Sequence, residues 1–179
     1  MDKRLKEYNI VFSSLKLGEH RFGYDLNTPF FEVFGFDEFT DPNLHVDVDM
    51  VKKNTMLEFE FSLKGTVVVR CDITDLPFEM EVSNSFGLLV KFGDAYNDED
   101  DEVLILPHGE YEVNIAQYLF ELAALSLPQK RVHPDVKSGK IGGEMLEKLR
   151  QLDPEDREEK NEENDDIDPR WDKLKDLLN

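Results

Sequence analysis

Alternation of apolar and polar residues is the strongest pattern in the chain. Residues 44–50 and 57–63 each carry an apolar side chain at every second position, with polar residues between them. The apolar positions are Leu44, Val46, Val48, Met50, Leu57, Phe59, Phe61 and Leu63. A period of two places these side chains on one face of a strand and the polar ones on the other. Both stretches are therefore predicted to be strands with one buried face and one face in water.

Further strand-like stretches follow closely along the chain. Gly65 precedes TVVVRCDI, which is rich in β-branched residues, and PFEMEVSNSFGLLVKF is expected to form one or two more strands. Two short β-prone pieces flank Gly18 near the N-terminus. Short turns between successive strands favour antiparallel pairing, because parallel strands need long crossovers. The predicted fold is α+β: mainly antiparallel β, as a meander or barrel-like sheet, with one packed helix.

The packed helix is expected near residues 113–127. Apolar residues recur there at helical spacing, and Pro128 ends the run. The start is open, because either a cap at Asn114 or a first residue at Glu112 fits the pattern. Earlier in the chain, TPFFEVFGFDEF is rich in phenylalanine. These rings are predicted to lie in the core, since monomers rarely expose large apolar areas.

Composition changes after Pro128 and divides the chain into three parts. Residues 1–134 form the β-rich domain. Residues 135–165 form an acidic linker that is expected to be largely disordered, with a short helix at 143–152. Residues 166–179 are expected to form an amphipathic helix, whose apolar face docks either on its own domain or on a partner.

Charge narrows the classes of partner. The chain has 179 residues and a net charge of -19. Acidity of this size repels phosphate backbones and suits a basic protein or simple solubility. A single cysteine fits a reducing compartment, and no run of about 20 apolar residues predicts a membrane span. We therefore expect a cytoplasmic protein without a membrane anchor.

The sequence lacks the short motifs that mark common catalytic, metal and cofactor sites. The sequence contains no glycine-rich phosphate loop, H-E-x-x-H, G-x-S-x-G or C-x-x-C motif. The acidic loop near residues 94–102 lacks the glycine and terminal glutamate of an EF-hand. The sequence therefore predicts no catalytic residue, no metal site and no cofactor, and a protein that is not an enzyme.

Cys71 has three interpretations: packing, a working thiol, or the remainder of a metal site. A structural zinc site commonly has pairs of Cys or His at short spacing, but Thr74 stands where a second thiol would be expected. Arg70 is adjacent in sequence but points to the opposite face of a strand. Packing, and thus a structural cysteine, is the preferred interpretation.

Three stretches together resemble the YceD/DUF177 family: GTVVVRCDITDLPFEMEV, LAALSLPQKRVHPD and the terminal DPRWDKLKDLL. The resemblance extends from about Gly65 to the C-terminus. The family is associated with accumulation of large-subunit (23S) ribosomal RNA in bacteria and plastids. Many members carry C-x-x-C after the strand, so the resemblance implies that Cys71 matches the first cysteine of that motif. Thr74 at the second position makes this a cysteine-poor branch.

The resemblance implies a role in large ribosomal subunit biogenesis. With the charge, it favours a non-enzymatic factor that contacts a ribosome-assembly protein or a basic ribosomal protein. The candidate contact residues in the C-terminal helix are Asp168, Pro169, Arg170, Trp171, Leu174 and Leu178. The alternative is direct RNA binding, which the net charge disfavours. The local basic patch for that alternative is Lys130, Arg131, Lys137 and Lys140.

Overall fold

The computed structural model describes residues 3–141 and residue 143. The chain forms two units, residues 1–131 and 132–179, and the strands all belong to the first. The strands of the described residues are β1 (Asn9–Ile10), β2 (Gly18–Leu26), β3 (Thr40–Lys52), β4 (Met56–Arg70), β5 (Pro77–Gly93), β6 (Asn97–Asp100), β7 (Val103–Pro107) and β8 (Val113–Asn114). The helices are η1 (Lys3–Tyr8), η2 (Phe12–Ser14), α1 (Thr28–Phe34), α2 (Ala116–Ala124) and α3 (Pro134–Lys137), where η marks a 3₁₀ helix.

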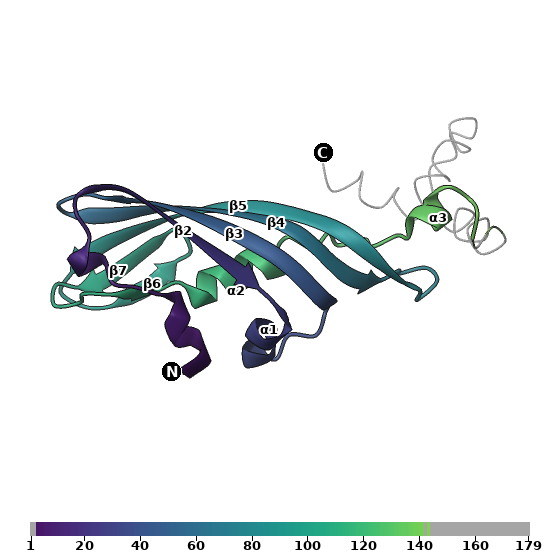
Figure 1. Ribbon diagram of the computed structural model, residues 1–179, viewed down its shortest axis with the longest axis horizontal. Helices are drawn as coiled ribbons and strands as arrows, with labels where there is room; N and C mark the ends of the chain where they lie inside the picture. Colours follow the sequence, from purple (N-terminus) through teal and green to yellow (C-terminus); the bar gives the residue numbers. More distant parts are fainter. Residues whose placement is uncertain (1–2, 142, 144–179) are drawn as a thin grey trace, which may run out of the picture. The chain divides into compact units, whose positions relative to one another are not determined.

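Six strands form one open sheet in the order β2-β3-β4-β5-β7-β6 (Figure 1). Successive strands from β2 to β5 pair antiparallel, as the short turns predicted. β7 is the exception, because it runs parallel to β5 and antiparallel to β6. β1 and β8 form a separate two-stranded pair. The prediction of a mainly antiparallel α+β fold is confirmed, with an open sheet rather than a barrel.

The apolar core lies on one face of this sheet, which we call the inner face. All eight alternating residues of β3 and β4 are buried, with at most 3% of their surface exposed. The register explains why they meet: Val46 lies opposite Leu63, and Val48 lies opposite Phe61. A cross-strand register that keeps both apolar rows on one side buries them together.

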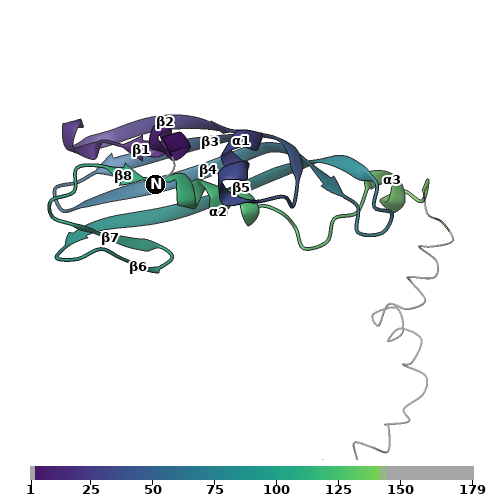
Figure 2. The same ribbon diagram turned by 90° about the horizontal axis from the view of Figure 1, so that it is seen from below.

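Helices α1 and α2 lie against the inner face (Figures 1 and 2). Phe34 of α1 stacks on Phe120 of α2, with ring centroids 4.3 Å apart. Of the five phenylalanines between residues 30 and 39, three are buried and two pack against the core: Phe30, Phe31 and Phe39, then Phe34 and Phe36. The predicted core role of these rings is confirmed.

The packed helix predicted near residues 113–127 is present as α2, but it is shorter than the predicted range, and the structure adds a second helix, α1. α1 was not predicted, although Pro29 in its first turn and Gly35 after its end are typical helix signals. Gly35 adopts the left-handed conformation with φ 64°. α2 begins at Ala116 rather than near residue 113, because Val113 and Asn114 pair with β1 instead.

Residues beyond the first unit are described only in part. α3 begins with Pro134, and the His133 side chain accepts a hydrogen bond from the backbone N–H of Asp135. The predicted helices at 143–152 and 166–179 fall outside the described residues, apart from position 143, as does most of the predicted linker at 135–165. No helix in the described part of the chain is long and apolar enough to cross a bilayer.

Candidate functional site

The turn that joins β4 to β5 carries the cysteine motif and forms the candidate site. Cys71 donates its backbone N–H to Leu76 O at 3.0 Å, and its own carbonyl accepts from the backbone N–H of Asp75 at 2.8 Å. Asp75 takes up the left-handed conformation at φ 57°, which closes the turn. The exposed Arg70 guanidinium donates to Asp75 Oδ2 at 2.8 Å. Local backbone bonds therefore set the shape of this turn.

Arg131 ties the turn to two distant parts of the chain. Its backbone N–H donates to Asp72 Oδ2 at 2.5 Å, and its carbonyl accepts from the backbone N–H of Asp72 at 2.8 Å. Its guanidinium donates from Nη1 to Glu38 O at 3.2 Å and from Nη2 to Glu38 Oε2 at 3.1 Å. Nε lies 3.9 Å from Asp72 Oδ1. Arg131 thus joins the turn, the segment before β3 and the segment after α2.

A hollow of about 660 Å³ lies beside this arrangement. It is lined by Asp37, Glu38, Phe39, Thr40, Val68, Val69, Arg70, Cys71, Asp72, Ile73, Thr74, Asp75, Pro77 and Arg131. The lining combines apolar side chains with four carboxylates and two arginines. Within the described residues, the buried atoms Thr74 Oγ1 and Arg131 Nε accept or donate no hydrogen bond. The lining therefore carries more acidic than basic side chains.

Cys71 lies at the end of β4 and is buried, with 3% of its surface exposed. Burial of this kind is what the packing interpretation expects of a cysteine. Within residues 3–141 and 143, no group of three or more His, Cys, Asp or Glu side chains is arranged to hold a metal ion. The structural role of Cys71 and its relation to a metal site remain predictions.

The four residues of the predicted basic patch have different surroundings. Arg131 belongs to the first unit, and its side chain is only 23% exposed because Glu38 and Asp72 flank it. Lys130 is exposed in the same unit. In the second unit, Lys137 is exposed and Lys140 pairs with Asp135, with Nζ and Oδ1 3.5 Å apart. The Arg131 side chain is therefore already paired with carboxylates.

Sequence reasoning did not find the partners of Arg131. Glu38 is 93 residues away along the chain and Asp72 is 59 residues away. No local spacing connects residues so far apart. The proposed contact residues Asp168 to Leu178 lie outside the described residues, so the structure places none of them.

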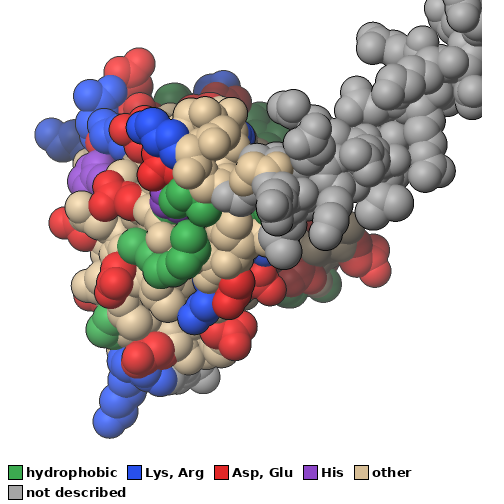
Figure 3. Space-filling model, turned by 90° about the vertical axis from the view of Figure 1, so that its right-hand side faces the viewer, with side chains coloured by type: hydrophobic (Ala, Val, Ile, Leu, Met, Phe, Trp, Pro, Cys, Tyr) green, Lys and Arg blue, Asp and Glu red, His purple; other side chains and the backbone are tan. Residues whose placement is uncertain are grey.

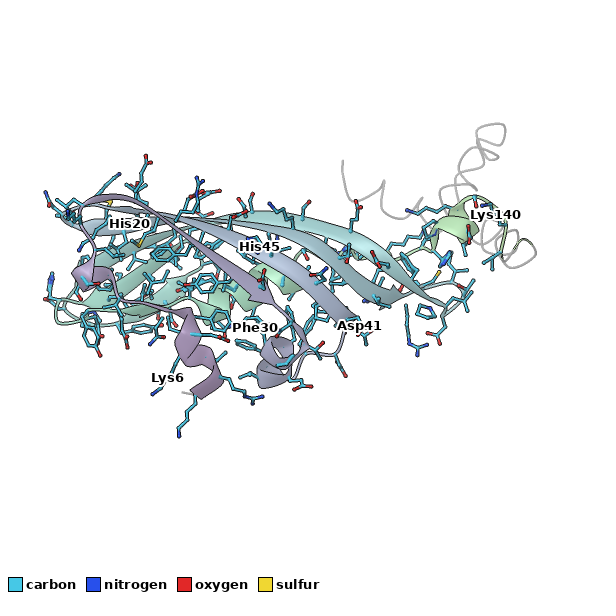
Figure 4. The ribbon with its side chains drawn as sticks, viewed as in Figure 1. Lys6, His20, Phe30, Asp41, His45 and Lys140 are labelled. Carbon is cyan, nitrogen blue, oxygen red and sulfur yellow. The ribbon has the colours of Figure 1, made fainter. Side chains whose placement is uncertain are left out.

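The face of the sheet opposite the core, which we call the outer face, carries mixed charges. Acidic and basic side chains are also interspersed at the end of the molecule that Figure 3 presents. On the outer face His45 Nδ1 lies 2.6 Å from Asp25 Oδ1, and Nε2 lies 3.5 Å from Asp47 Oδ1. His45 projects from β3, whereas Phe30 of α1 lies on the other side of the sheet (Figure 4). Lys64 Nζ lies 3.3 Å from Asp47 Oδ2, so Asp25, His45, Asp47 and Lys64 form a continuous row of charged side chains.

Two side chains on this face, His45 and Asp47, have shifted pKa values. The hydrogen bond to Asp25 raises the pKa of His45, and the charges of Asp25 and Asp47 add to the effect. The hydrogen bond from Lys64 lowers the pKa of Asp47. Both shifts favour the charged forms. Because the groups are largely exposed, we read the row as solvent-screened surface electrostatics rather than a catalytic device.

Comparison with known protein families finds a match. Residues 59–178 match the family described as "Large ribosomal RNA subunit accumulation protein YceD". The matched range covers more than half of the 179 residues and includes most of β4, all of β5, the turn at Cys71 and Arg131. No curated protein matches the chain. No solved structure matches it either.

Proposed function

The chain belongs to the YceD family of large ribosomal RNA subunit accumulation proteins, and we propose that it acts as a non-enzymatic factor that contacts a protein of the large ribosomal subunit or of its assembly. The family supports a role in ribosomal subunit biogenesis. The protein-contact mechanism is our proposal. The sequence supports the non-enzymatic part, because it contains no glycine-rich phosphate loop, H-E-x-x-H motif or G-x-S-x-G motif.

Charge is the observation that carries the protein-contact mechanism. Ribosomal RNA is a polyanion, and a chain with a net charge of -19 is repelled by it at long range. A basic ribosomal protein or a basic assembly factor is attracted by the same field, which raises the rate of encounter. The partner class is therefore a basic protein, in a cytoplasmic setting.

Arg131 supports the same choice. Phosphate binding by arginine needs guanidinium N–H groups that point into solvent. Both Nη groups of Arg131 donate to Glu38, and Asp72 lies beside Nε. Recruiting the Arg131 guanidinium to RNA would compete with its two hydrogen bonds to Glu38, whereas the backbone hydrogen bonds to Asp72 would remain. The alternative of direct RNA binding would then depend on Lys130, Lys137 and Lys140.

The contact is proposed to involve the C-terminal stretch. Trp171, Leu174 and Leu178 recur at helical spacing and supply an apolar stripe. A stripe of about three turns is too short to form a stable isolated helix in water. It is therefore proposed to fold against a surface, and docking in cis and docking on the partner are both compatible with the pattern.

The test is affinity recovery of the tagged full-length chain from cells, with and without ribonuclease. We expect large-subunit proteins to be recovered in similar amounts after ribonuclease treatment, because the contact is with protein. Loss of all ribosomal proteins after ribonuclease would contradict the proposal and favour RNA-mediated association.

Two variants sharpen this experiment. Trp171→Ala with Leu174→Ala removes most of the apolar stripe and is expected to reduce recovery strongly. The matched control, Lys137→Ala with Lys140→Ala, changes two exposed residues of the basic patch and should leave recovery unchanged. The reverse result, with recovery lost only in the lysine variant, would support the RNA-binding alternative.

A further inference from the structure

One edge of the six-stranded sheet is long and regular, and it belongs to β2. All nine residues of β2 pair in unbroken register with β3. Among the described residues no strand pairs with the other side of β2. A strand at the edge of a sheet presents a row of unpaired backbone N–H and C=O groups, which is a template for another strand. The opposite edge, β6, has four residues and an irregular register.

We propose that the β2 edge pairs with β2 of a second copy of this chain, with a two-fold axis at Gly23. In an antiparallel pair centred there, Arg21 of each copy lies opposite Asp25 of the other. The symmetry therefore gives two Arg–Asp pairs, one on each side of the axis. On the inner face, Phe22 of each copy lies opposite Tyr24 of the other. The edge is thus complementary to itself in both charge and apolar character.

Other registers lack this complementarity. A two-fold axis at Phe22 brings Glu19 opposite Asp25, and a two-fold axis at Arg21 sets the two Arg21 side chains against each other. A two-fold axis at Tyr24 leaves Asp25 without an opposing cation. Like charges directly opposite each other destabilise a sheet, whereas opposite charges stabilise it. Electrostatics therefore selects the register centred on Gly23.

The side chains that would meet across the edge are available for it. Arg21 and Asp25 are highly exposed, at 76% and 85% of their side-chain surfaces. Arg21 donates from Nε to Asp49, and an arginine carries two further Nη groups that can donate. Asp25 uses Oδ1 for His45, and a carboxylate has a second oxygen.

Gly23 suits the centre of this pair because it has no side chain. On the outer face, the space that a Cβ at Gly23 would enter lies 3.3 Å from His45 Cε1. The His45 ring of the neighbouring strand therefore covers the glycine, and two copies can approach at the axis without opposing side chains.

Net charge and interface size determine how tightly the two copies are expected to associate. Seven residues of each strand, 20–26, pair in this register, which is a small interface. The charge of each chain opposes association at long range, but physiological salt screens it beyond about 8 Å. The dimer is therefore expected to be weak and concentration-dependent.

The test is sedimentation equilibrium of the full-length chain at physiological salt. The molar mass of the wild-type protein is expected to rise from one chain toward two between about 1 µM and about 300 µM, the range of small interfaces. Arg21→Asp and Asp25→Arg each place like charges across the edge, and each should raise the dissociation constant at least about tenfold. The double variant restores opposite charges and should return to within about threefold of wild type.

Arg70→Asp is the matched control, because it makes the same charge change at another exposed ion pair of the sheet, and it should leave association unchanged. Circular dichroism verifies that each variant is folded. A wild-type protein that stays a single chain throughout this range overturns the proposal. So does a dimer that is insensitive to the single changes, or a double variant that fails to recover.

Discussion

The inner and outer faces of the sheet are made from alternate residues of the same strands, yet they differ in almost every physical respect. On the inner face Val48, Leu57 and Phe61 have no exposed surface. On the outer face Arg21 and Asp25 are mostly in water. Burial of apolar surface contributes strongly to stability, while exposed ion pairs contribute little. The comparison teaches that the outer face is free to change for recognition at small cost in stability.

The largest difference is expected at Phe61, which has no exposed surface and lies 5.8 Å from the Phe59 ring between centroids. Phe61→Ala should lower the free energy of unfolding by about 3–5 kcal/mol, because it leaves a cavity in a packed core. Urea unfolding measures this change. Glu60→Ala, its neighbour on the outer face, should change the value by no more than about 0.5 kcal/mol. Equal effects at the two positions would remove the distinction between the faces.

A second contrast uses two glycines of the sheet. Gly65 has φ 154°, and an added Cβ would lie 2.1 Å from Asn43 O. Gly65→Ala should therefore lower the free energy of unfolding by more than about 1 kcal/mol. At Gly87 an added Cβ meets only ordinary contacts, the nearest at 3.4 Å to Glu60 Oε2. Gly87→Ala is expected to be close to neutral in the same urea titration, and a loss as large as that of Gly65→Ala would contradict this account.

The smallest effect is a pH dependence that the outer face contributes through His45. The pKa of His45 is raised above its ordinary 6.5 by the hydrogen bond to Asp25. A raised folded-state pKa adds stability that is full below pH 6.5 and is lost as pH rises through the folded-state pKa. Unfolding free energies measured across pH 5–9 should therefore fall more in the wild type than in His45→Gln. Solvent screening keeps the difference small.

Proton NMR of the imidazole gives an independent check of that prediction. The His45 resonance should titrate above pH 6.5, and Asp25→Asn should bring the midpoint down. A His45 midpoint at or below pH 6.5 in the wild type would show that Asp25 and Asp47 do not stabilise the charged imidazole.

Alternation was sufficient to predict β3 and β4 and their buried rows from the sequence. It was not sufficient for α1: Phe30, Phe31 and Phe34 stand at helical spacing, but a helix of seven residues is too short for that spacing to decide, although Pro29 and Gly35 mark its ends. The pairing of Asn9 and Ile10 with Val113 and Asn114 was also out of reach, because it joins segments more than 100 residues apart. Such pairing depends on tertiary packing that no local pattern records.

The candidate site shows the same division between local and distant information. Cys71 and Thr74 were identified from their spacing, and the residues of the basic patch from their composition. The two carboxylates that flank Arg131 come from other parts of the chain. They make Arg131 less available to an RNA phosphate than the sequence suggests. A basic side chain that looks available for a partner in the sequence can already be paired with carboxylates in the folded protein.

The most direct test of the central claim is equilibrium binding of the purified full-length chain to 23S ribosomal RNA as salt is varied. If recognition is through protein, binding should be weak at physiological salt and indifferent to Lys130→Glu combined with Lys137→Glu and Lys140→Glu. Tight binding that weakens steeply with salt, and that is lost in this triple variant, would contradict the account. That result would identify the basic patch, rather than a protein contact, as the functional surface.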